Sequence, residues 1–430
     1  MNIIVFLTIY ITTLRTKIRR KLLLNYIPNR VCNWYFNFHH AGREEIKILN
    51  LTWFDEENIT LKKLLRDGIK SFIYPPNFLG SSPVIESNIS PSVFYVQYQN
   101  ARIQITSSSV VVNDEKIVIE RAQIHERAIL DYSQPPVLIH DQRNAVIRKP
   151  NAENIVQGIF LGGNGSSNYY HWLIELVVKL EFITLLPSYL QDYPLLISED
   201  VFQIKSFEEV LELYMNKLTI RPRIKVLKKL CSYVVNDLVY INSPNSLPFN
   251  LFGDGEYKAS YVAFDNRSIN FLRNSALTEA FNGLSQDCKY KKIFIYRNNS
   301  RRKYNQDEVF TYLEAYGFTK VNMSDLSFLD QVRIFHNAEC IVGPTGAEWT
   351  NLVFARKGTR ALCWMPQEAG NFSAFSTISG IVNVDLKYIT YKAGSAGSKF
   401  IYSHKYCIDL NMVKLGLNEL GVCNSEAIDS

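Results

Sequence analysis

Residues 339–351, which read Glu-Cys-Ile-Val-Gly-Pro-Thr-Gly-Ala-Glu-Trp-Thr-Asn, decide the fold of this chain. The apolar run at 339–343 predicts a buried strand, and the Gly343-Pro344 pair that ends it predicts a tight turn. A helix is predicted from Gly346 to Phe354. The N–H groups at the start of such a helix point outward and favour an anion. The stretch therefore predicts an α/β unit with an anion-binding turn at its tip, to which the Thr345 hydroxyl adds a donor.

The same alternation of strand and helix extends to both sides of this stretch. Strands are predicted at 292–297, 318–322, 339–343 and 360–364, and helices at 306–316, 327–337 and 346–354. Strand–helix units of this length predict a parallel, doubly wound sheet. Ligands bind such sheets at the carboxyl ends of the strands. Arg297 and the turn at 344–347 both follow strands and should lie at that edge.

A second α/β region precedes the first. Its predicted strands are 158–161, 194–197, 223–226 and 238–241, and its helices are 169–186 and 206–215, the latter with Ser206 as N-cap. Before it, alternating residues at 93–98 and 101–106 and a hairpin at 109–120 predict a small antiparallel sheet at the domain edge. Residues 1–85 are irregular in pattern, with a helix predicted at 61–71.

These patterns predict an α/β protein with four parts. They are a basic, irregular segment at 1–90, an α/β domain at 91–275, a Rossmann-like domain at 276–390 and a C-terminal segment at 391–430. A chain of 430 residues is too long for one ordinary core, which agrees with two domains.

Composition narrows the function classes. A hydrophobic fraction of 47% with 20% charged residues is typical of a soluble globular protein. The net charge of +6 suits an anionic substrate or an anionic membrane surface, and the chain lacks the basic-aromatic repeats or zinc knuckles of nucleic-acid binders. Seven scattered cysteines without a Cys-x-x-Cys motif indicate a reducing compartment, and hence a cytoplasmic protein.

The N-terminus has two interpretations. The apolar run from Ile3 to Leu14 is shorter than the roughly 20 residues that a membrane span needs, and basic residues follow it. The order of charge and apolar residues does not match a signal peptide. The segment is either an ordinary amphipathic first helix or a peripheral contact with the anionic inner face of the cytoplasmic membrane.

A basic segment follows the strand at 292–297. Arg297, Arg301, Arg302 and Lys303 are separated by polar residues and could surround a diphosphate. Arginine suits this task because its planar guanidinium can bind two phosphate oxygens. The alternative is a solvated basic loop.

A possible base lies in the helix predicted at 169–186. His171 and Glu175 are four residues apart and so project from one helical face. A histidine supported by a carboxylate can take a proton from a sugar hydroxyl. The alternative is a buried histidine, with Glu175 paired to Lys179. No Asp-x-Asp motif occurs in the chain, which favours a transfer reaction without a metal ion.

Four blocks together resemble glycosyltransferase family 61, and the resemblance runs from about Val93 to Pro366. The blocks are Asn168-Tyr-Tyr-His-Trp-Leu-Ile-Glu175, Tyr296-Arg297 with Arg301, Arg302 and Asn305, Leu326-Ser-Phe-Leu-Asp-Gln331, and Val342-Gly-Pro-Thr-Gly-Ala-Glu-Trp-Thr-Asn351. The resemblance implies a GT-B-like fold, in which two Rossmann-like domains face a cleft. It also implies an inverting reaction without a metal or other cofactor.

The same resemblance assigns roles to residues. His171 and Glu175 would be catalytic, and the acceptor side would include Asn168, Tyr170 and Trp172. The donor would contact Arg297, Arg301, Arg302, Asn305, Thr345, Gly346, Ala347, Glu348 and Asn351. Many members carry His-Gly-Ala-Gly where this chain has Thr345-Gly-Ala-Glu348, so a carboxylate close to a diphosphate is a departure from the pattern.

The sequence therefore predicts an inverting, metal-independent glycosyltransferase. It would move a sugar from a nucleotide-diphosphate donor to a hydroxyl of an oligosaccharide or lipid-linked glycan, in the assembly of bacterial surface polysaccharide such as capsule or lipopolysaccharide. The alternative is a non-catalytic relative that binds a nucleotide or glycan as an assembly partner. A nucleotide-dependent dehydrogenase is disfavoured because the first strand–helix turn lacks Gly-x-Gly-x-x-Gly.

Overall fold

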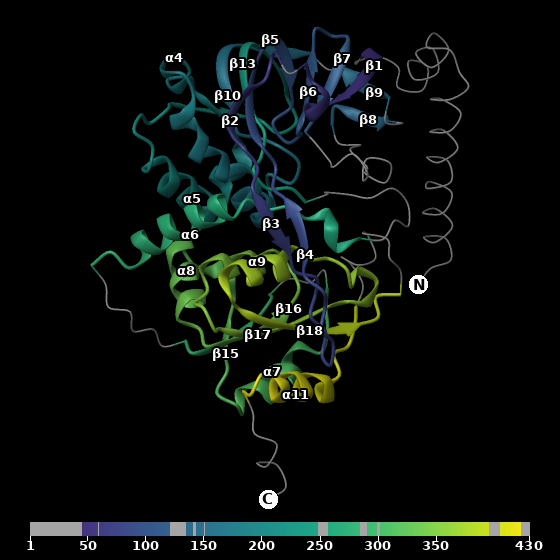
Figure 1. Ribbon diagram of the computed structural model, residues 1–430, viewed down its shortest axis with the longest axis vertical. Helices are drawn as coiled ribbons and strands as arrows, with labels where there is room; N and C mark the ends of the chain where they lie inside the picture. Colours follow the sequence, from purple (N-terminus) through teal and green to yellow (C-terminus); the bar gives the residue numbers. More distant parts are fainter. Residues whose placement is uncertain are drawn as a thin grey trace, which may run out of the picture.

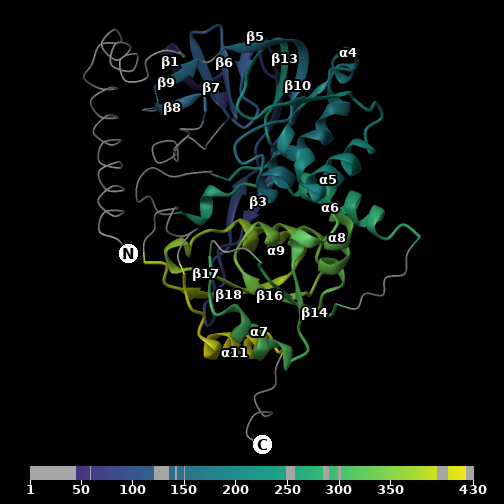
Figure 2. The same cartoon turned by 180° about the vertical axis from the view of Figure 1, so that it is seen from behind.

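The computed structural model describes residues 45–58, 60–120, 135–140, 143–149, 151–247, 257–283, 290–298, 302–394 and 405–422. Two large sheets lie one above the other, with helices packed between them (Figure 1), and the view from behind shows the same division (Figure 2). The predicted N-terminal apolar segment and its basic flank lie outside the described residues. Within these ranges, no helix combines the length and apolarity needed to cross a membrane.

The lower sheet has five parallel strands in the order β15-β14-β16-β17-β18. They are β14 (Lys292–Ile295), β15 (Thr319–Val321), β16 (Cys340–Pro344), β17 (Arg360–Pro366) and β18 (Asp385–Tyr391). Numbered from the first strand of the sheet, this is the order 2-1-3-4-5 of a doubly wound fold, whose ligand lies where the order reverses. The predicted parallel sheet is confirmed, and its switch point lies between β14 and β16.

The helices of the lower half cover both faces of this sheet. α7 (Gln306–Glu314) and α11 (Leu410–Glu419) lie below it, while α8 (Phe328–Asn337) and α9 (Ala374–Val382) lie above it (Figure 1). A 3-10 helix, η8 (Ala347–Phe354), packs beside α8 and α9. Successive strand residues point to opposite faces. Accordingly Phe294 and Val342 belong to the core with α7 and α11, whereas Ile293 and Ile341 belong to the core on the other face.

Most of the helix boundaries in this half agree with the prediction. Gly317 (φ 79°) follows α7 and ends it as expected. Ser327 caps α8 by accepting from the Asp330 N–H, whereas Ser324 and Asp325 form a separate 3-10 turn, η7 (Met323–Asp325). The helix predicted at 346–354 is the 3-10 helix η8.

The upper sheet has eleven strands among the described residues, in the order β12-β11-β10-β13-β5-β6-β7-β1-β9-β8, and β2 also pairs with β5. They are β1 (Glu45–Trp53), β2 (Lys63–Arg66), β5 (Val93–Ile103), β6 (Ser109–Val112), β7 (Lys116–Ile119), β8 (Val137–His140), β9 (Asn144–Lys149), β10 (Ala152–Phe160), β11 (Leu195–Ser198), β12 (Ile224–Leu227) and β13 (Ser232–Ile241). The strands β12, β11, β10 and β13 are parallel, and β13 pairs antiparallel with β5.

This sheet corrects two expectations. The predicted antiparallel strands β5, β6 and β7 are antiparallel, but they do not form a small sheet of their own, because β5 pairs directly with β13 and so continues the α/β sheet. The upper half is consequently a mixed sheet, and only its first four strands have the Rossmann-like parallel order. The β6–β7 hairpin is confirmed, with Asn113 and Asp114 at φ 53° and 55° in its turn.

The helices of the upper half lie beside the upper sheet and, for the most part, between the two sheets (Figure 1). They are α3 (Tyr169–His171), the π-helix η3 (Trp172–Leu176), the 3-10 helix η4 (Val177–Leu185), α4 (Ser188–Gln191), α5 (Lys205–Met215) and α6 (Asn266–Ala280). The single α-helix predicted at 169–186 is therefore a succession of three helical types. Ser206 is not the N-cap of α5, since α5 begins at Lys205 and Ile204 precedes it. The described residues also contain short 3-10 turns, which are η1 (Phe54–Glu56), η5 (Glu199–Gln203), η6 (Ala259–Tyr261) and η9 (Gln367–Ala369).

One apolar core joins the two halves. It takes Ile159 and Leu195 from the upper sheet and Ile341 and Cys363 from the lower sheet, with the helices between them. A backbone contact adds to this packing, because the Phe328 N–H at the start of α8 donates to the Glu209 carboxylate of α5 at 2.5 Å.

The segment from β2 to β4, residues 63–89, runs from the upper half to the lower sheet, and we call it the arm. The helix predicted at 61–71 is wrong, because this stretch forms β2 and the start of β3 (Lys70–Ile73), which pairs with β4 (Glu86–Ile89). The side chains of β3 alternate between exposed and buried, which is the period of a strand. Beyond β3, the Tyr388 N–H of β18 donates to the Asn77 carbonyl at 2.9 Å, and Figure 1 shows the arm reaching the lower sheet.

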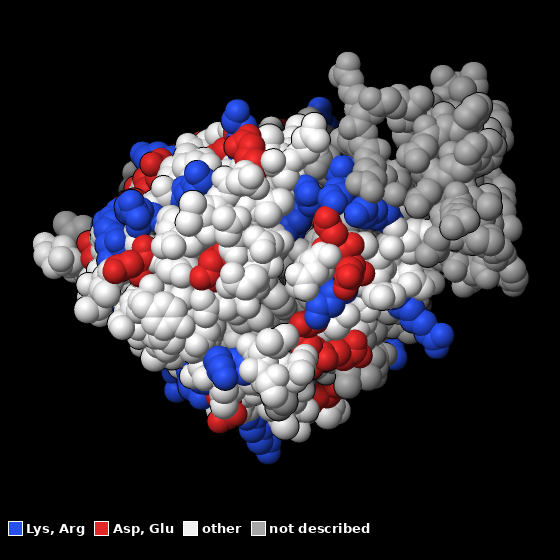
Figure 3. All heavy atoms as spheres, turned by 90° about the horizontal axis from the view of Figure 1, so that it is seen from above, with Lys and Arg blue, Asp and Glu red and all other residues white. Residues whose placement is uncertain are grey.

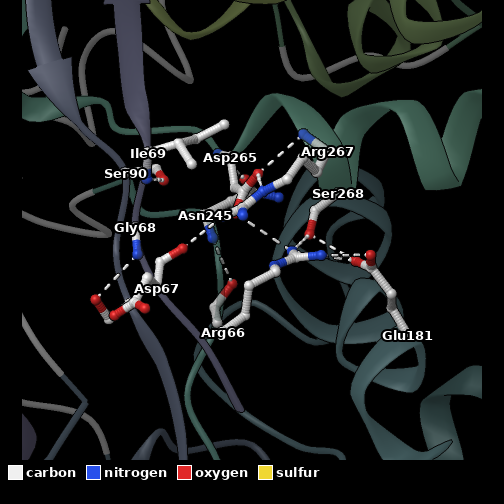
Figure 4. A network of polar contacts seen from close by, with 12 residues as sticks. Arg66, Asp67, Gly68, Ile69, Ser90, Glu181, Asn245, Asp265, Arg267 and Ser268 are labelled. Carbon is white, nitrogen blue, oxygen red and sulfur yellow. Dashed lines mark hydrogen bonds and ion pairs between the residues drawn. The ribbon is translucent and has the colours of Figure 1, made fainter. Parts of the chain in front are cut away.

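A buried polar network holds the base of this arm (Figure 4). Arg66 of β2 contacts the Glu181 carboxylate at 2.5 Å, the Ser268 hydroxyl, and Asp265 at 3.3 Å. Arg267 pairs with the same Asp265 at 2.8 Å. Two arginines thus balance two carboxylates where β2, η4 and α6 meet.

The upper end of the molecule carries charges of both signs close together (Figure 3). In the β6–β7 turn, for example, Asp114 pairs with Lys149 and lies 4.0 Å from Lys47 and 3.9 Å from Arg102. Basic and acidic side chains are thus interspersed on the described part of this end.

Candidate functional site

The predicted donor residues gather at the switch point of the lower sheet. Arg297 follows β14, and the turn Thr345-Gly346 follows β16, its neighbour in the sheet. The backbone of Arg297 is fixed by the Gln306 side chain. Gln306 Oε1 accepts from the Arg297 N–H at 3.0 Å, and Gln306 Nε2 donates to the Arg297 carbonyl at 3.0 Å. Sequence reasoning missed Gln306, since only the folded chain brings it back onto Arg297.

The Arg297 side chain crosses the turn after β16. Its Nη2 donates to the Thr345 carbonyl at 2.8 Å and to Glu348 Oε2 at 3.0 Å. The side chain is 10% exposed, and its buried Nε has no hydrogen-bond partner among the described residues. One guanidinium N–H is therefore buried and unused at the switch point.

Gly346 makes this crossing possible. A Cβ at residue 346 would lie 1.7 Å from Arg297 Nη2 and 2.4 Å from Glu348 Oε2. The backbone there is extended (φ 175°), so the need for glycine comes from the close approach of the side chains rather than from the backbone angle. The Arg297–Glu348 pair thus lies directly over the turn that was predicted to bind phosphate.

Glu348 is ionised in this setting. Burial by itself opposes ionisation of the carboxyl, but Arg297, the Glu348 backbone N–H and Arg302 together lower its pKa below the usual value. In turn the Glu348 carboxylate more than offsets the effect of burial on Arg297 and raises the pKa of its guanidinium. The carboxylate is 29% exposed and stands in the first turn of η8.

An aromatic stack stands beside the two arginines. The ring of Tyr406 lies between Tyr304 and Tyr391, with centroids 5.0 Å and 3.7 Å away and planes within 7°. Burial raises the pKa of the Tyr406 hydroxyl, and the positive charges of Arg297 and Arg302 oppose that rise. These tyrosines come from three separate segments, and no sequence pattern brought them together.

The remaining donor residues occupy different positions. Arg301 lies outside the described residues. Arg302 acts on Glu348 through its charge. The Asn305 amide donates to the Ile408 carbonyl at 3.0 Å and accepts from the Ile408 N–H at 2.8 Å, so it fastens the C-terminal segment. Ala347 opens η8, and the Thr345 side chain contacts the buried Cys363 thiol.

The predicted base and its carboxylate are in contact. His171 Nδ1 lies 2.8 Å from Glu175 Oε2, and the His171 side chain is 10% exposed. Glu175 Oε1 also accepts from the Leu247 N–H at 3.1 Å. The alternative pairing of Glu175 with Lys179 is wrong, because Lys179 pairs with Glu120 at 3.2 Å. The carboxylate is therefore held by the backbone and can orient the imidazole.

A wide helical turn brings the pair together. Between His171 and Glu175 the helix is of the π type, and the Ile174 carbonyl accepts from Asn245 Nδ2 at 2.7 Å. Turns of this type are frequent at functional sites. Asn245 and Leu247 come from the segment after β13, so helix periodicity around His171 gave no sign of them.

The predicted acceptor-side residues divide into two groups. Asn168 caps α3 by accepting from the Tyr170 N–H at 2.9 Å. The Tyr170 ring packs edge-on against His171, and its buried hydroxyl has no hydrogen-bond partner among the described residues. Trp172 is completely buried, and its ring stacks on Phe207 with 5.9 Å between centroids. That position does not fit the acceptor contact predicted for Trp172.

A hydrogen-bonded chain joins the acceptor side to the donor side. The Tyr169 hydroxyl donates to Asn351 Oδ1 at 2.7 Å, and Asn351 Nδ2 donates to Gln331 Oε1 at 2.9 Å. Asn351 is completely buried, so it belongs to the joint between the halves and not to a surface open to the donor. Through this chain α3, which carries His171, is fixed on η8, which carries Glu348.

The candidate residues thus form two groups, a histidine–carboxylate pair on α3 and η3 and an arginine beside a glycine turn at the switch point of the lower sheet. The Tyr169–Asn351 hydrogen bond links the elements that carry the two groups. The family model described as Glycosyltransferase 61 matches residues 169–362, from α3 to β17. This part of the chain belongs to glycosyltransferase family 61, and the protein is a glycosyltransferase. No curated protein matches the chain.

Proposed function

We propose that this glycosyltransferase transfers a sugar from a nucleotide-diphosphate donor to a glycan hydroxyl, with inversion and without a metal ion. The donor would bind the part at 276–390 and the acceptor the part at 91–275, in a GT-B-like arrangement. The position of Arg297 carries the proposal. A buried arginine with an unused N–H, beside a glycine turn at the switch point, suits the phosphates of a nucleotide.

On the donor side, Arg297, Arg302 and the N–H groups of Gly346 and Ala347 stabilise the leaving diphosphate. Charge builds up on the leaving phosphate oxygen as the bond to the sugar breaks. Donors that are already in place when this charge develops lower the barrier, each by about 3 kcal/mol. Arginines in this position supply the positive charge that a divalent cation supplies in metal-dependent transferases. The nucleotide sugar itself is a co-substrate and not a cofactor.

On the acceptor side, His171 takes the proton of the attacking hydroxyl, and Glu175 holds the imidazole and balances its positive charge. The hydroxyl oxygen forms a bond to the anomeric carbon from the face opposite the diphosphate. The bond between that carbon and the phosphate oxygen breaks, and the nucleoside diphosphate leaves with the electron pair. Attack from the opposite face inverts the configuration at this carbon.

The biological setting is part of the proposal. A cytoplasmic enzyme in contact with the inner face of the membrane would act on a lipid-linked or oligosaccharide acceptor for bacterial capsule or lipopolysaccharide. The alternative is a binding protein without turnover. The closed Arg297–Glu348 pair favours that alternative, because an anion of the chain itself already contacts the arginine.

Calorimetric titration with UDP, GDP, CMP and dTDP, with and without EDTA, tests the donor site, and release of nucleoside diphosphate from the corresponding sugar donors tests turnover. We expect one nucleotide to bind in EDTA, Arg297→Ala to abolish that binding, and turnover in Arg297→Ala to fall about a hundredfold or more. His171→Gln should bind the nucleotide as the wild type does and lose turnover.

The outcomes separate the two candidate functions. Nucleotide binding without turnover in the wild type, over a panel of sugar donors and glycan acceptors, supports the non-catalytic alternative. Binding that needs a divalent cation would contradict the metal-free site. Full activity of a folded Arg297→Ala variant would refute the donor assignment.

A further inference from the structure

Three observations show that the Glu348 carboxylate lies where an anion is favoured. Its carboxylate contacts Arg297 Nη2 at 3.0 Å, the guanidinium assigned to the donor phosphate. It accepts a hydrogen bond from its own backbone N–H in the first turn of η8, where an anion is favoured by the helix. It also lies over Gly346, since a Cβ there would be 2.4 Å from Glu348 Oε2.

The three groups around the Glu348 carboxylate are of the kind that holds phosphate in other proteins. An arginine, a backbone N–H at a helix start and a glycine that lets the anion approach are the usual elements of phosphate sites. In this structure the Glu348 carboxylate makes those contacts. The charge of Arg297 is thus balanced without a ligand, because the Glu348 carboxylate neutralises it.

We propose that Glu348 occupies the donor-phosphate position as an internal anion, so that the donor must displace it to bind. The inference rests on the proposed function, because it takes Arg297 as the phosphate ligand. When a nucleoside diphosphate enters, the Arg297–Glu348 pair opens and the phosphate takes over the guanidinium. The 29% exposure of the carboxylate leaves it a path to water, which compensates it for the lost partner.

This arrangement makes Glu348 a determinant of donor affinity and selectivity. The more negative the ligand, the better it competes with a carboxylate for Arg297. A nucleoside diphosphate should therefore displace Glu348 more readily than a nucleoside monophosphate. Removing the carboxylate should strengthen the binding of both ligands and reduce the difference between them.

The test is calorimetry of the full chain in EDTA. The first probes are UDP, UMP and inorganic pyrophosphate. The second probes are the diphosphate and monophosphate of the nucleoside that binds in the screen above. Glu348→Gln keeps the shape of the side chain and removes its charge, and Glu348→Ala removes the group. We expect both variants to bind the diphosphate about tenfold tighter than the wild type. Glu339→Gln is the control for net charge, because it removes an exposed carboxylate paired with Lys291.

Each outcome decides the proposal. Tighter binding in both Glu348 variants and unchanged binding in Glu339→Gln support it. Equal or weaker binding in folded Glu348 variants, while wild-type binding still depends on Arg297, overturns it and leaves the donor site intact. In that case Glu348 holds Arg297 in place. Absence of binding in the wild type and all variants overturns both the inference and the donor assignment.

Discussion

At the residue scale, the donor side of the site depends on a glycine. Gly346 lets the Arg297 guanidinium and the Glu348 carboxylate meet over the turn after β16. The atoms that a Cβ would meet are the ends of two flexible side chains, so the fold can accommodate a methyl group by moving them. Such a change should therefore act on the site far more than on stability.

Gly346→Ala should lower nucleotide affinity at least tenfold and reduce the free energy of unfolding by less than about 1 kcal/mol. Gly358→Ala is the matched control, since Gly358 has open space around it but a left-handed backbone (φ 82°). It should cost about 1 kcal/mol of stability and leave binding unchanged. Calorimetry and urea unfolding measure both effects. Wild-type affinity in Gly346→Ala would show that the position of Arg297 does not matter for the donor.

At the scale of elements, the short helix α3 connects the acceptor side of the site with the donor side. It carries His171 and is fixed on η8 by the Tyr169–Asn351 hydrogen bond. The sequence predicted a helix here and the pairing of His171 with Glu175, because residues four apart share a helical face. It did not predict the π turn, since that turn is held by Asn245 from a distant segment.

Tyr169→Phe tests this joint. It leaves the buried Asn351 Oδ1 without its Tyr169 donor, which should cost about 1–3 kcal/mol of stability. Tyr214→Phe is the matched control, because its buried hydroxyl donates to the Leu272 carbonyl of α6 at 2.7 Å and makes no hydrogen bond to η8 among the described contacts. Both variants should lose similar stability, but only Tyr169→Phe should lower kcat, about tenfold, with donor affinity unchanged. Rates that fall equally in the two variants would make Tyr169 an ordinary core residue.

At the scale of the whole molecule, the sequence predicted four of the five strands of the lower sheet, β18 excepted, and the parallel strands β10 to β13 of the upper sheet, but not the order of the whole upper sheet. In the lower sheet each strand is joined to the next by one helix, so the sequence shows the order of elements directly. In the upper sheet β5 pairs with β13, and the arm at 74–79 binds β18. Neither pairing leaves a local pattern. The predicted helix at 61–71 failed because this stretch forms β2 and the start of β3, which pair with β5 and β4. Similarly, Arg297 and Gly346 were predictable from strand ends, whereas the Arg297–Glu348 contact was not.

The polar network around Arg66 fixes the base of the arm, and through it the arm's position between the two halves. Arg66 joins β2 to Glu181 and Asp265, and Asp265 is completely buried (Figure 4). The Asp265 N–H also donates to Asn245 Oδ1 at 2.9 Å, and Asn245 holds the π turn beside His171. Loss of Arg66 therefore leaves Glu181 without its arginine and Asp265 with Arg267 alone, at a point that connects the arm with the site.

Arg66→Leu should lower the free energy of unfolding by about 3–5 kcal/mol, because removing one partner of a buried ion pair leaves the other uncompensated. Arg221→Leu is the control, since its pair with Glu212 is exposed at 50% and 43% and should contribute less than about 1 kcal/mol. Urea unfolding followed by circular dichroism measures both. If the two variants lose the same stability, the network does not hold the arm, and the arm is held by its contacts with β18.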